Sequence, residues 1–137
     1  MNTIYMYLGL SGVLTLLLWT PYIVARMFAW GIPTFLNNYP EGFPEKAPAQ
    51  PLWAARAQRA HLNMVETMPA FIAVTLAATG LLAGNAEAIA TVSSFAQLFF
   101  FARLAHAVVY ILGIPFLRTP VYLVSWFAIL AIAVQFI

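Results

Sequence analysis

The sequence contains no cysteine and very little charge. Without cysteine, the 137-residue chain can form no disulfide, no thiolate metal site and no cysteine nucleophile of its own. Charged residues make up 7% of the sequence and hydrophobic residues 64%, whereas about a quarter of the residues of a soluble domain are charged. The net charge of +2 comes without a basic run, so we expect no nucleic-acid partner. This composition indicates an integral membrane protein, and we expect no bound metal.

Four apolar segments are long enough, or nearly so, for membrane helices of about 20 residues. They cover about residues 4–26, 52–83, 88–112 and 119–137. The first lacks a positively charged start, so we expect a retained helix and not a cleaved signal peptide. Pro21 should kink it near Leu17, because proline clashes with the carbonyl four residues earlier. Residues 33–51 hold five prolines, which predicts an exposed cytoplasmic loop without helix. We therefore predict a single all-α domain over residues 1–137, folded as an up-down four-helix transmembrane bundle.

The positive charges are distributed unevenly over these segments. All of them fall at the end of the first segment, just before or at the start of the second, near the end of the third, or just before the fourth. They are Arg26, Lys46, Arg56, Arg59, Arg103 and Arg118. The positive-inside rule places this end in the cytoplasm and both termini on the other side. Because the loops are compact and no retention signal is present, we expect a bacterial inner membrane with periplasmic termini.

A polar stripe opens the second segment. At about 100° per residue, Arg56, Arg59, Asn63 and Glu66 fall within about 80° of the helix circumference, and His61 points away from them. A charged stripe in a membrane helix costs several kcal/mol unless it is paired or faces water. Its presence therefore indicates a functional site or a buried interface.

Two further polar groups lie at the same end of the chain. Arg103, His106 and Tyr110 share one face of the third segment, and Arg118 and Tyr122 are one turn apart at the start of the fourth. We expect all three groups to converge on one cavity. The excess of arginine suits a ligand with more than one carboxylate, because guanidinium binds carboxylate in a bidentate way.

These charged residues also have structural interpretations. Arg26, Arg56 and Arg103 could extend to lipid phosphates, as arginines at the ends of membrane helices often do. Arg59 and Glu66 could form an ion pair that only supports the fold.

The aromatic and histidine residues have structural interpretations too. Tyr110 and Tyr122 could belong to the belt of aromatic residues at the membrane surface. His61 suits packing or indirect support of a site better than ligand contact. A haem held by His61 and His106 is conceivable in a helical bundle.

Two longer motifs resemble the signatures of the MAPEG family, the membrane-associated proteins in eicosanoid and glutathione metabolism. The first is Arg59-Ala60-His61-Leu62-Asn63, followed by Glu66 and Pro69-Ala70-Phe71, and the second is Arg103-x-x-His106-x-x-x-Tyr110, followed by Arg118-Thr119-Pro120 and Tyr122. The resemblance extends over all four segments. The His-Leu-Asn wording is closest to the microsomal glutathione transferase branch, whereas the spacing from Tyr110 to Arg118 is one residue shorter than in some members.

The resemblance implies a homotrimer that binds glutathione on the cytoplasmic side, between neighbouring subunits. Arg118 would stabilise the glutathione thiolate, with Tyr110 and Tyr122 as further catalytic residues, and Arg26 would contribute from the adjacent subunit. Together with the remaining members of the polar stripes, the expected glutathione-binding residues are Arg26, Arg56, Arg59, Asn63, Glu66, Arg103, His106, Tyr110, Arg118 and Tyr122.

The implied function is a glutathione-dependent detoxifying transferase or peroxidase. Its hydrophobic small-molecule substrates, lipophilic electrophiles or lipid hydroperoxides, would arrive from the surrounding membrane lipids. A non-catalytic lipid-binding or scaffold protein of the same fold is the alternative, because the family also contains members without catalysis. A small transporter subunit, with arginines along an anion path, is a third possibility.

Overall fold

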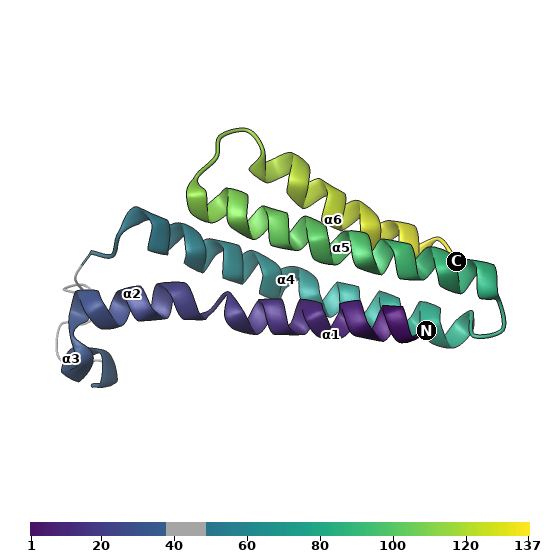
Figure 1. Ribbon diagram of the computed structural model, residues 1–137, viewed down its shortest axis with the longest axis horizontal. Coiled ribbons are helices and arrows are strands. Elements are labelled where there is room, and N and C mark those ends of the chain that lie inside the picture. Colours follow the sequence, from purple (N-terminus) through teal and green to yellow (C-terminus); the bar gives the residue numbers. More distant parts are fainter. Residues whose placement is uncertain (38–48) are drawn as a thin grey trace.

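The structure is a computed structural model that describes residues 1–37 and 49–137. Its regular secondary structure over these residues consists of helices that run side by side in an elongated bundle (Figure 1). The helices are α1 (Asn2–Leu17), α2 (Thr20–Trp30), α3 (Ile32–Leu36), α4 (Leu52–Leu81), α5 (Ala86–Leu112) and α6 (Arg118–Ala133). The prediction of an all-α fold is confirmed for these residues.

The first apolar segment is divided into two helices. α1 ends at Leu17 and α2 begins at Thr20, at the place where Pro21 was expected to disturb the helix. The Thr20 hydroxyl donates a hydrogen bond of 2.5 Å to the Leu17 carbonyl oxygen, which is the carbonyl that the proline leaves without its usual partner. The helical segment continues to Trp30, four residues beyond its predicted end.

The proline-rich segment begins with a helix that the sequence did not predict. α3 covers Ile32–Leu36 and has Pro33 in its first turn, where a helix needs no N–H donor and proline is well tolerated. The expectation that the prolines exclude a helix from residues 33–51 is therefore wrong for residues 33–36. The larger part of the expected loop, residues 38–48 with Lys46, lies outside the described residues.

Three stretches of helix are long and apolar enough to cross a membrane. They are Asn2–Trp30, Leu52–Leu81 and Ala86–Leu112. α6 is apolar but has 16 residues, about 24 Å at 1.5 Å per residue, which is shorter than a hydrocarbon core of about 30 Å. The fourth predicted segment is thus a shorter helix, and it packs chiefly along α5.

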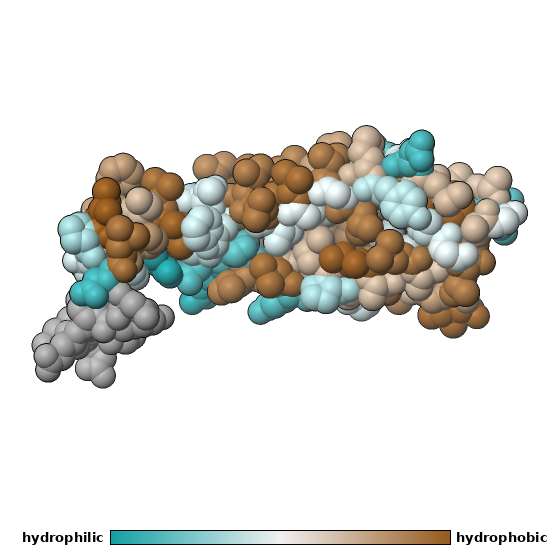
Figure 2. All heavy atoms as spheres, turned by 90° about the horizontal axis from the view of Figure 1, so that it is seen from below, coloured by the Kyte–Doolittle hydropathy of each residue, from teal (hydrophilic) through white to brown (hydrophobic). Residues whose placement is uncertain are grey.

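Aromatic and small side chains form the centre of the bundle. Phe71 of α4 and Phe99 of α5 are fully buried and stack with their ring centroids 3.8 Å apart. Ala96 of α5 and Ala128 of α6 are also fully buried, and such small residues allow membrane helices to approach closely. Hydrophobic side chains cover much of the outer face shown in Figure 2, as expected for a surface in contact with lipid.

The two ends of the bundle differ in character. Figure 1 shows both termini at the same end as the α4–α5 turn, whereas α2, α3 and the α5–α6 connection lie at the opposite end. The described cationic residues are all on the half that contains this opposite end, which we call the cationic end: Arg26, Arg56, Arg59, Arg103 and Arg118. The side of the membrane that it faces stays a prediction.

Candidate functional site

A pocket of about 370 Å³ lies where α4, α5 and α6 meet near the cationic end. We call it the central pocket. It is lined by Arg59 and Asn63 of α4, His106 and Tyr110 of α5, and Arg118, Thr119 and Tyr122 of α6. The structure thus brings together six of the ten predicted site residues. Sequence reasoning missed Thr119, although it directly follows Arg118 within the second motif.

Aromatic rings form one wall of the central pocket. His106 and Tyr110 are one helical turn apart, and their rings meet edge to face with centroids 5.5 Å apart. Tyr122 approaches His106 from α6 at a centroid distance of 6.0 Å. His106 is 2% exposed, and its buried ring packs against both tyrosines.

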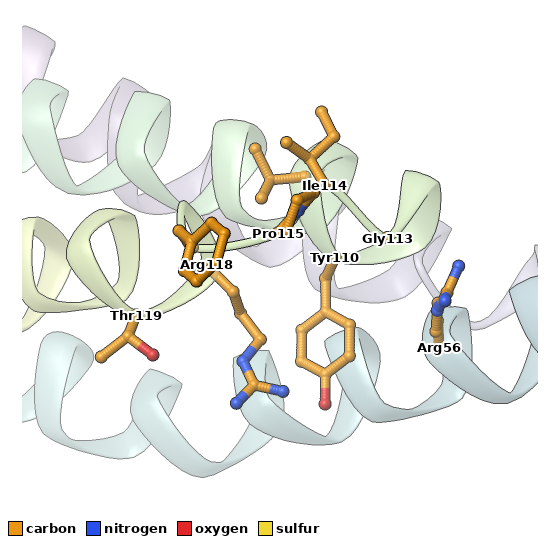
Figure 3. A pocket seen from close by; sticks show the side chains of 9 residues that line it. Arg56, Tyr110, Gly113, Ile114, Pro115, Arg118 and Thr119 are labelled. Atoms are coloured by element: carbon orange, nitrogen blue, oxygen red, sulfur yellow. The ribbon is translucent and has the colours of Figure 1, made fainter.

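Arg118 extends from the start of α6 beside Tyr110. The centre of its guanidinium lies 5.1 Å from the centroid of the Tyr110 ring, and Figure 3 shows the two side chains extending in the same direction. This cation–π contact orients the guanidinium without using its N–H donors. Within the described chain Arg118 forms no hydrogen bond, so these donors are available to an anion.

Arg103 lies beneath the central pocket. The side chain is 1% exposed; its Nη2 donates to Asn63 Oδ1 at 2.9 Å and its Nε donates to Met64 Sδ at 3.2 Å. The guanidinium also lies 5.6 Å from the centroid of the Tyr122 ring. Arg103 therefore holds two of the lining residues, Asn63 and Tyr122, from below. Its Nη1 is buried and has no partner in the described part of the chain.

Two predicted residues line pockets that adjoin the central one. Arg56 lines a pocket of about 400 Å³ that shares Tyr110, Arg118 and Thr119 with the central pocket. Glu66 lies at an apolar groove of about 400 Å³ between α4 and α6, which shares Tyr122 with the central pocket. The other residues of this groove are Thr67, Ala70, Val74, Trp126, Ile129, Leu130 and Ala133.

Arg26 is engaged elsewhere in its own chain. Its Nη2 donates to Gln58 Oε1 at 2.8 Å, and its guanidinium lies 5.4 Å from the ring centroids of both Tyr22 and Trp30. It lines none of the three pockets described above. Within a single chain, Arg26 is therefore separate from the central pocket.

The two histidines have different surroundings. His61 Nδ1 shares a hydrogen bond of 2.9 Å with the Tyr22 hydroxyl, and His61 lines a pocket with residues of α1 and with Trp19. His106 lines the central pocket. Neither belongs to a group of three potential metal ligands in residues 1–37 and 49–137. This arrangement gives no support to a haem shared by the two histidines, and it agrees with a packing role for His61.

The electrostatic character of the site is cationic. Arg56, Arg59 and Arg118 make no hydrogen bond to any described residue, and no ion pair joins Arg59 to Glu66 in this part of the chain. Among the described residues, Glu66 is the one acidic residue that lines any of the three pockets. Guanidinium groups without protein partners are suited to bind carboxylate, phosphate or thiolate.

Fold and site together define a class: a helical membrane protein whose helices meet around a cationic, tyrosine-walled pocket. The model of the MAPEG family matches residues 4–137, and the chain belongs to this family. Comparisons with curated proteins and with solved structures give no match. The family includes glutathione transferases and peroxidases but also other members, so the branch and the activity are addressed as proposals.

Proposed function

We propose that this protein is a homotrimeric membrane transferase or peroxidase that uses glutathione as co-substrate. Glutathione carries a carboxylate at each end, an ammonium group and a thiol. The observation that carries the proposal is the central pocket, where Arg59 and Arg118 offer free guanidinium donors beside the hydroxyl groups of two tyrosines. A ligand with separated carboxylates and an ionisable thiol matches this set of donors better than a neutral lipid does.

The proposed roles follow from the position of each side chain. Arg59 and Asn63, both on α4, hold carboxylate and amide groups of glutathione, with Arg103 keeping Asn63 in place. Arg118 faces the sulfur, because its guanidinium is oriented by Tyr110 and uses none of its donors within the described chain. A neighbouring cation favours the thiolate over the thiol, which makes the sulfur a better nucleophile at neutral pH.

The apolar groove supplies a route for the second substrate. It shares Tyr122 with the central pocket and runs along α4 and α6, and Trp126 and Leu130 are about half exposed on it. A lipophilic electrophile in the bilayer can lie in this groove with its reactive atom near Tyr122. The thiolate is then held close to the electrophile, and proximity lowers the barrier to attack.

The chemistry needs no covalent enzyme intermediate. With an electrophilic carbon, the sulfur forms a C–S bond and the leaving group, or the oxygen of an opened ring, takes the electron pair and then a proton. With a hydroperoxide, the sulfur attacks the outer oxygen, the O–O bond breaks and the inner oxygen leaves as an alcohol. The glutathione sulfenic acid then reacts with a second glutathione to give the disulfide and water.

Assembly into a trimer is supported by the exposure of charged side chains. Glu66 lies 14 residues after the start of α4, about 21 Å along the helix, and its side chain is exposed, as are those of Arg59 and Arg118. Charges at such positions cost several kcal/mol when they face lipid. Neighbouring subunits would cover these side chains and bring Arg26 of one subunit toward the pocket of the next.

The test is calorimetric titration of the purified protein with glutathione and with S-methylglutathione, whose sulfur cannot ionise. We expect both to bind, glutathione to bind more tightly as the pH rises, and turnover of a lipophilic electrophile only with the free thiol. The second candidate, a non-catalytic lipid-binding protein, is favoured by the apolar groove. Lipid binding without glutathione binding would support it and contradict the first proposal.

A further inference from the structure

The pocket that Arg56 lines, next to the central pocket, combines positive charge with an apolar rim. It has a volume of about 400 Å³ and lies between the start of α4, the end of α5 and the α5–α6 connection (Figure 3). We call it the outer pocket. It shares Arg118 with the central pocket and adds Arg56, and its lining continues through Gly113, Ile114, Pro115 and Phe116.

Arg56 is fitted closely to the end of α5. Gly113 ends this helix in the left-handed conformation, with φ at +69°, and a Cβ atom at this position would collide with the Arg56 guanidinium. The left-handed backbone conformation favours glycine here, and without a Cβ atom the Arg56 guanidinium can approach the end of the helix closely. The partial negative charge at the C-terminus of α5 favours a cation at this place.

No acidic side chain of the described residues balances the two arginines of the outer pocket. Neither Arg56 nor Arg118 has a hydrogen-bond partner among residues 1–37 and 49–137, and no acidic side chain from these residues lines the pocket. Two guanidinium groups that offer several N–H donors each are suited to an oxyanion such as phosphate. The outer pocket is therefore an anion site by its charge.

The rim of the outer pocket is apolar. Phe116 is 93% exposed and has a φ of +66°, a conformation that non-glycine residues rarely adopt. Ile114, next to it on the rim, is 38% exposed. Both lie in the connection between two apolar helices, at the end of the bundle where a bilayer would have its head groups. A soluble anion gains nothing from such a rim, whereas an amphiphile can place its acyl chains against it.

We propose that Arg56 and Arg118 hold the phosphate of an anionic membrane lipid in the outer pocket, with its acyl chains along Ile114 and Phe116. This lipid site adjoins the proposed glutathione site and shares Tyr110, Arg118 and Thr119 with it. The proposal assigns Arg56 to the lipid and not to glutathione. The proposal does not depend on catalysis, because it rests on the two arginines and the apolar rim of the outer pocket and not on a reaction.

The test measures lipid retention in the absence of glutathione. The purified protein in neutral detergent is titrated with phosphatidylglycerol, or with phosphatidylcholine for comparison, and bound lipid is counted by native mass spectrometry. We expect preferential retention of phosphatidylglycerol and a loss of at least about fivefold in Arg56→Gln, the factor that one arginine contributes near an anionic surface. Arg56→Lys keeps the charge but not the forked geometry and should lose less.

Arg26→Gln is the matched control. It removes the same charge at the same end of the bundle, but the Arg26 guanidinium is engaged by Gln58 and two rings and does not line the outer pocket of its own chain. We therefore expect a loss of less than about twofold. Because lipid retention is measured without glutathione, the proposed contribution of Arg26 to the glutathione site of a neighbouring subunit does not enter this comparison. Equal losses in both glutamine variants would show non-specific surface attraction and overturn the proposal. Displacement of the lipid by an equal concentration of inorganic phosphate would identify a site for free anions and also overturn it.

Glutathione titration of the same variants separates the two proposals. If Arg56→Gln retains lipid normally but binds glutathione weakly, Arg56 belongs to the glutathione site and the lipid proposal fails. If it loses lipid in a protein that does not bind glutathione, the lipid proposal holds and the proposed function fails.

Discussion

The central prediction concerns Arg118→Ala and the ionisation of bound glutathione. Two unit charges about 4 Å apart interact by about 4 kcal/mol at an effective dielectric constant of 20 and by about 1 kcal/mol in bulk water. Because Arg118 is exposed and the central pocket is open, we take ~2 kcal/mol for its effect on the thiolate. A free thiol of this type ionises near pH 8.5, so about 3% is thiolate at pH 7, and ~2 kcal/mol raises this fraction to about half.

The loss of affinity in Arg118→Ala should depend strongly on pH. The bound thiol ionises at a lower pH than the free thiol, so the stabilisation from Arg118 is present at high pH and is lost as the pH falls through about 7. The same ~2 kcal/mol predicts that Arg118→Ala weakens glutathione binding about twofold at pH 7 and about fifteenfold at pH 8.5. The measurements are calorimetry at the two pH values and the ultraviolet absorbance of the bound thiolate.

The matched variant for this experiment is Arg59→Ala. Arg59 lines the same pocket, but its proposed partner is a carboxylate that stays charged over this pH range. Its removal should weaken binding by about 1–3 kcal/mol at both pH values and leave the thiolate fraction of bound glutathione unchanged. If Arg118→Ala keeps full thiolate absorbance, the assigned mechanism is wrong, and Tyr110 or Tyr122 becomes the next candidate.

Three further predictions concern topology, assembly and the buried arginine. Cysteines placed at Asn2 and Gly84 should react with an impermeant maleimide outside intact cells, and one at the exposed Asn37 of the cationic end should not; the reverse pattern would overturn the proposed orientation. The purified protein should be a trimer in detergent, and a stable monomer at micromolar concentration would contradict a shared site. Arg103→Ala should lower the free energy of unfolding by about 3 kcal/mol, because it empties a buried position and leaves Asn63 without its partner. Arg103→Met, which fills the space, should lose less stability in thermal unfolding. Equal losses of stability in the two variants would show that lost packing is not the cause of the destabilisation.

The sequence predicted which residues share a helix face, but not how deeply each is buried. Arg103, His106 and Tyr110 fall on one face by spacing, and the structure places them together. Arg103 is nevertheless beneath the pocket, because Asn63 and Met64 of the neighbouring helix cover its guanidinium. Periodicity gives the direction of a side chain around its own helix, whereas its burial depends on which side chains of the neighbouring helix cover it.

The sequence also did not predict that residues of one polar stripe line different pockets. Arg56 and Arg59 share a stripe but differ by about 4.5 Å along the helix axis, and the end of α5 at Gly113 lies against Arg56. The hydrogen bond between His61 and Tyr22 joins residues 39 positions apart, and no local sequence pattern predicts such a contact. By contrast, the interruption of the first segment was predictable, because proline acts on the carbonyl four residues before it.

The α5–α6 connection explains how a short spacing between Tyr110 and Arg118 can still place them side by side. The Gly113 N–H donates to the Tyr110 carbonyl at 3.1 Å, and the Ile114 N–H donates to the Val109 carbonyl at 3.0 Å. These two bonds form a Schellman motif, which ends α5 one turn after Tyr110 and reverses the chain at once. α6 then begins at Arg118 itself, so the guanidinium reaches back over the ring of Tyr110. The closeness of these two residues is therefore set by the glycine cap and the length of the connection, not by either helix alone.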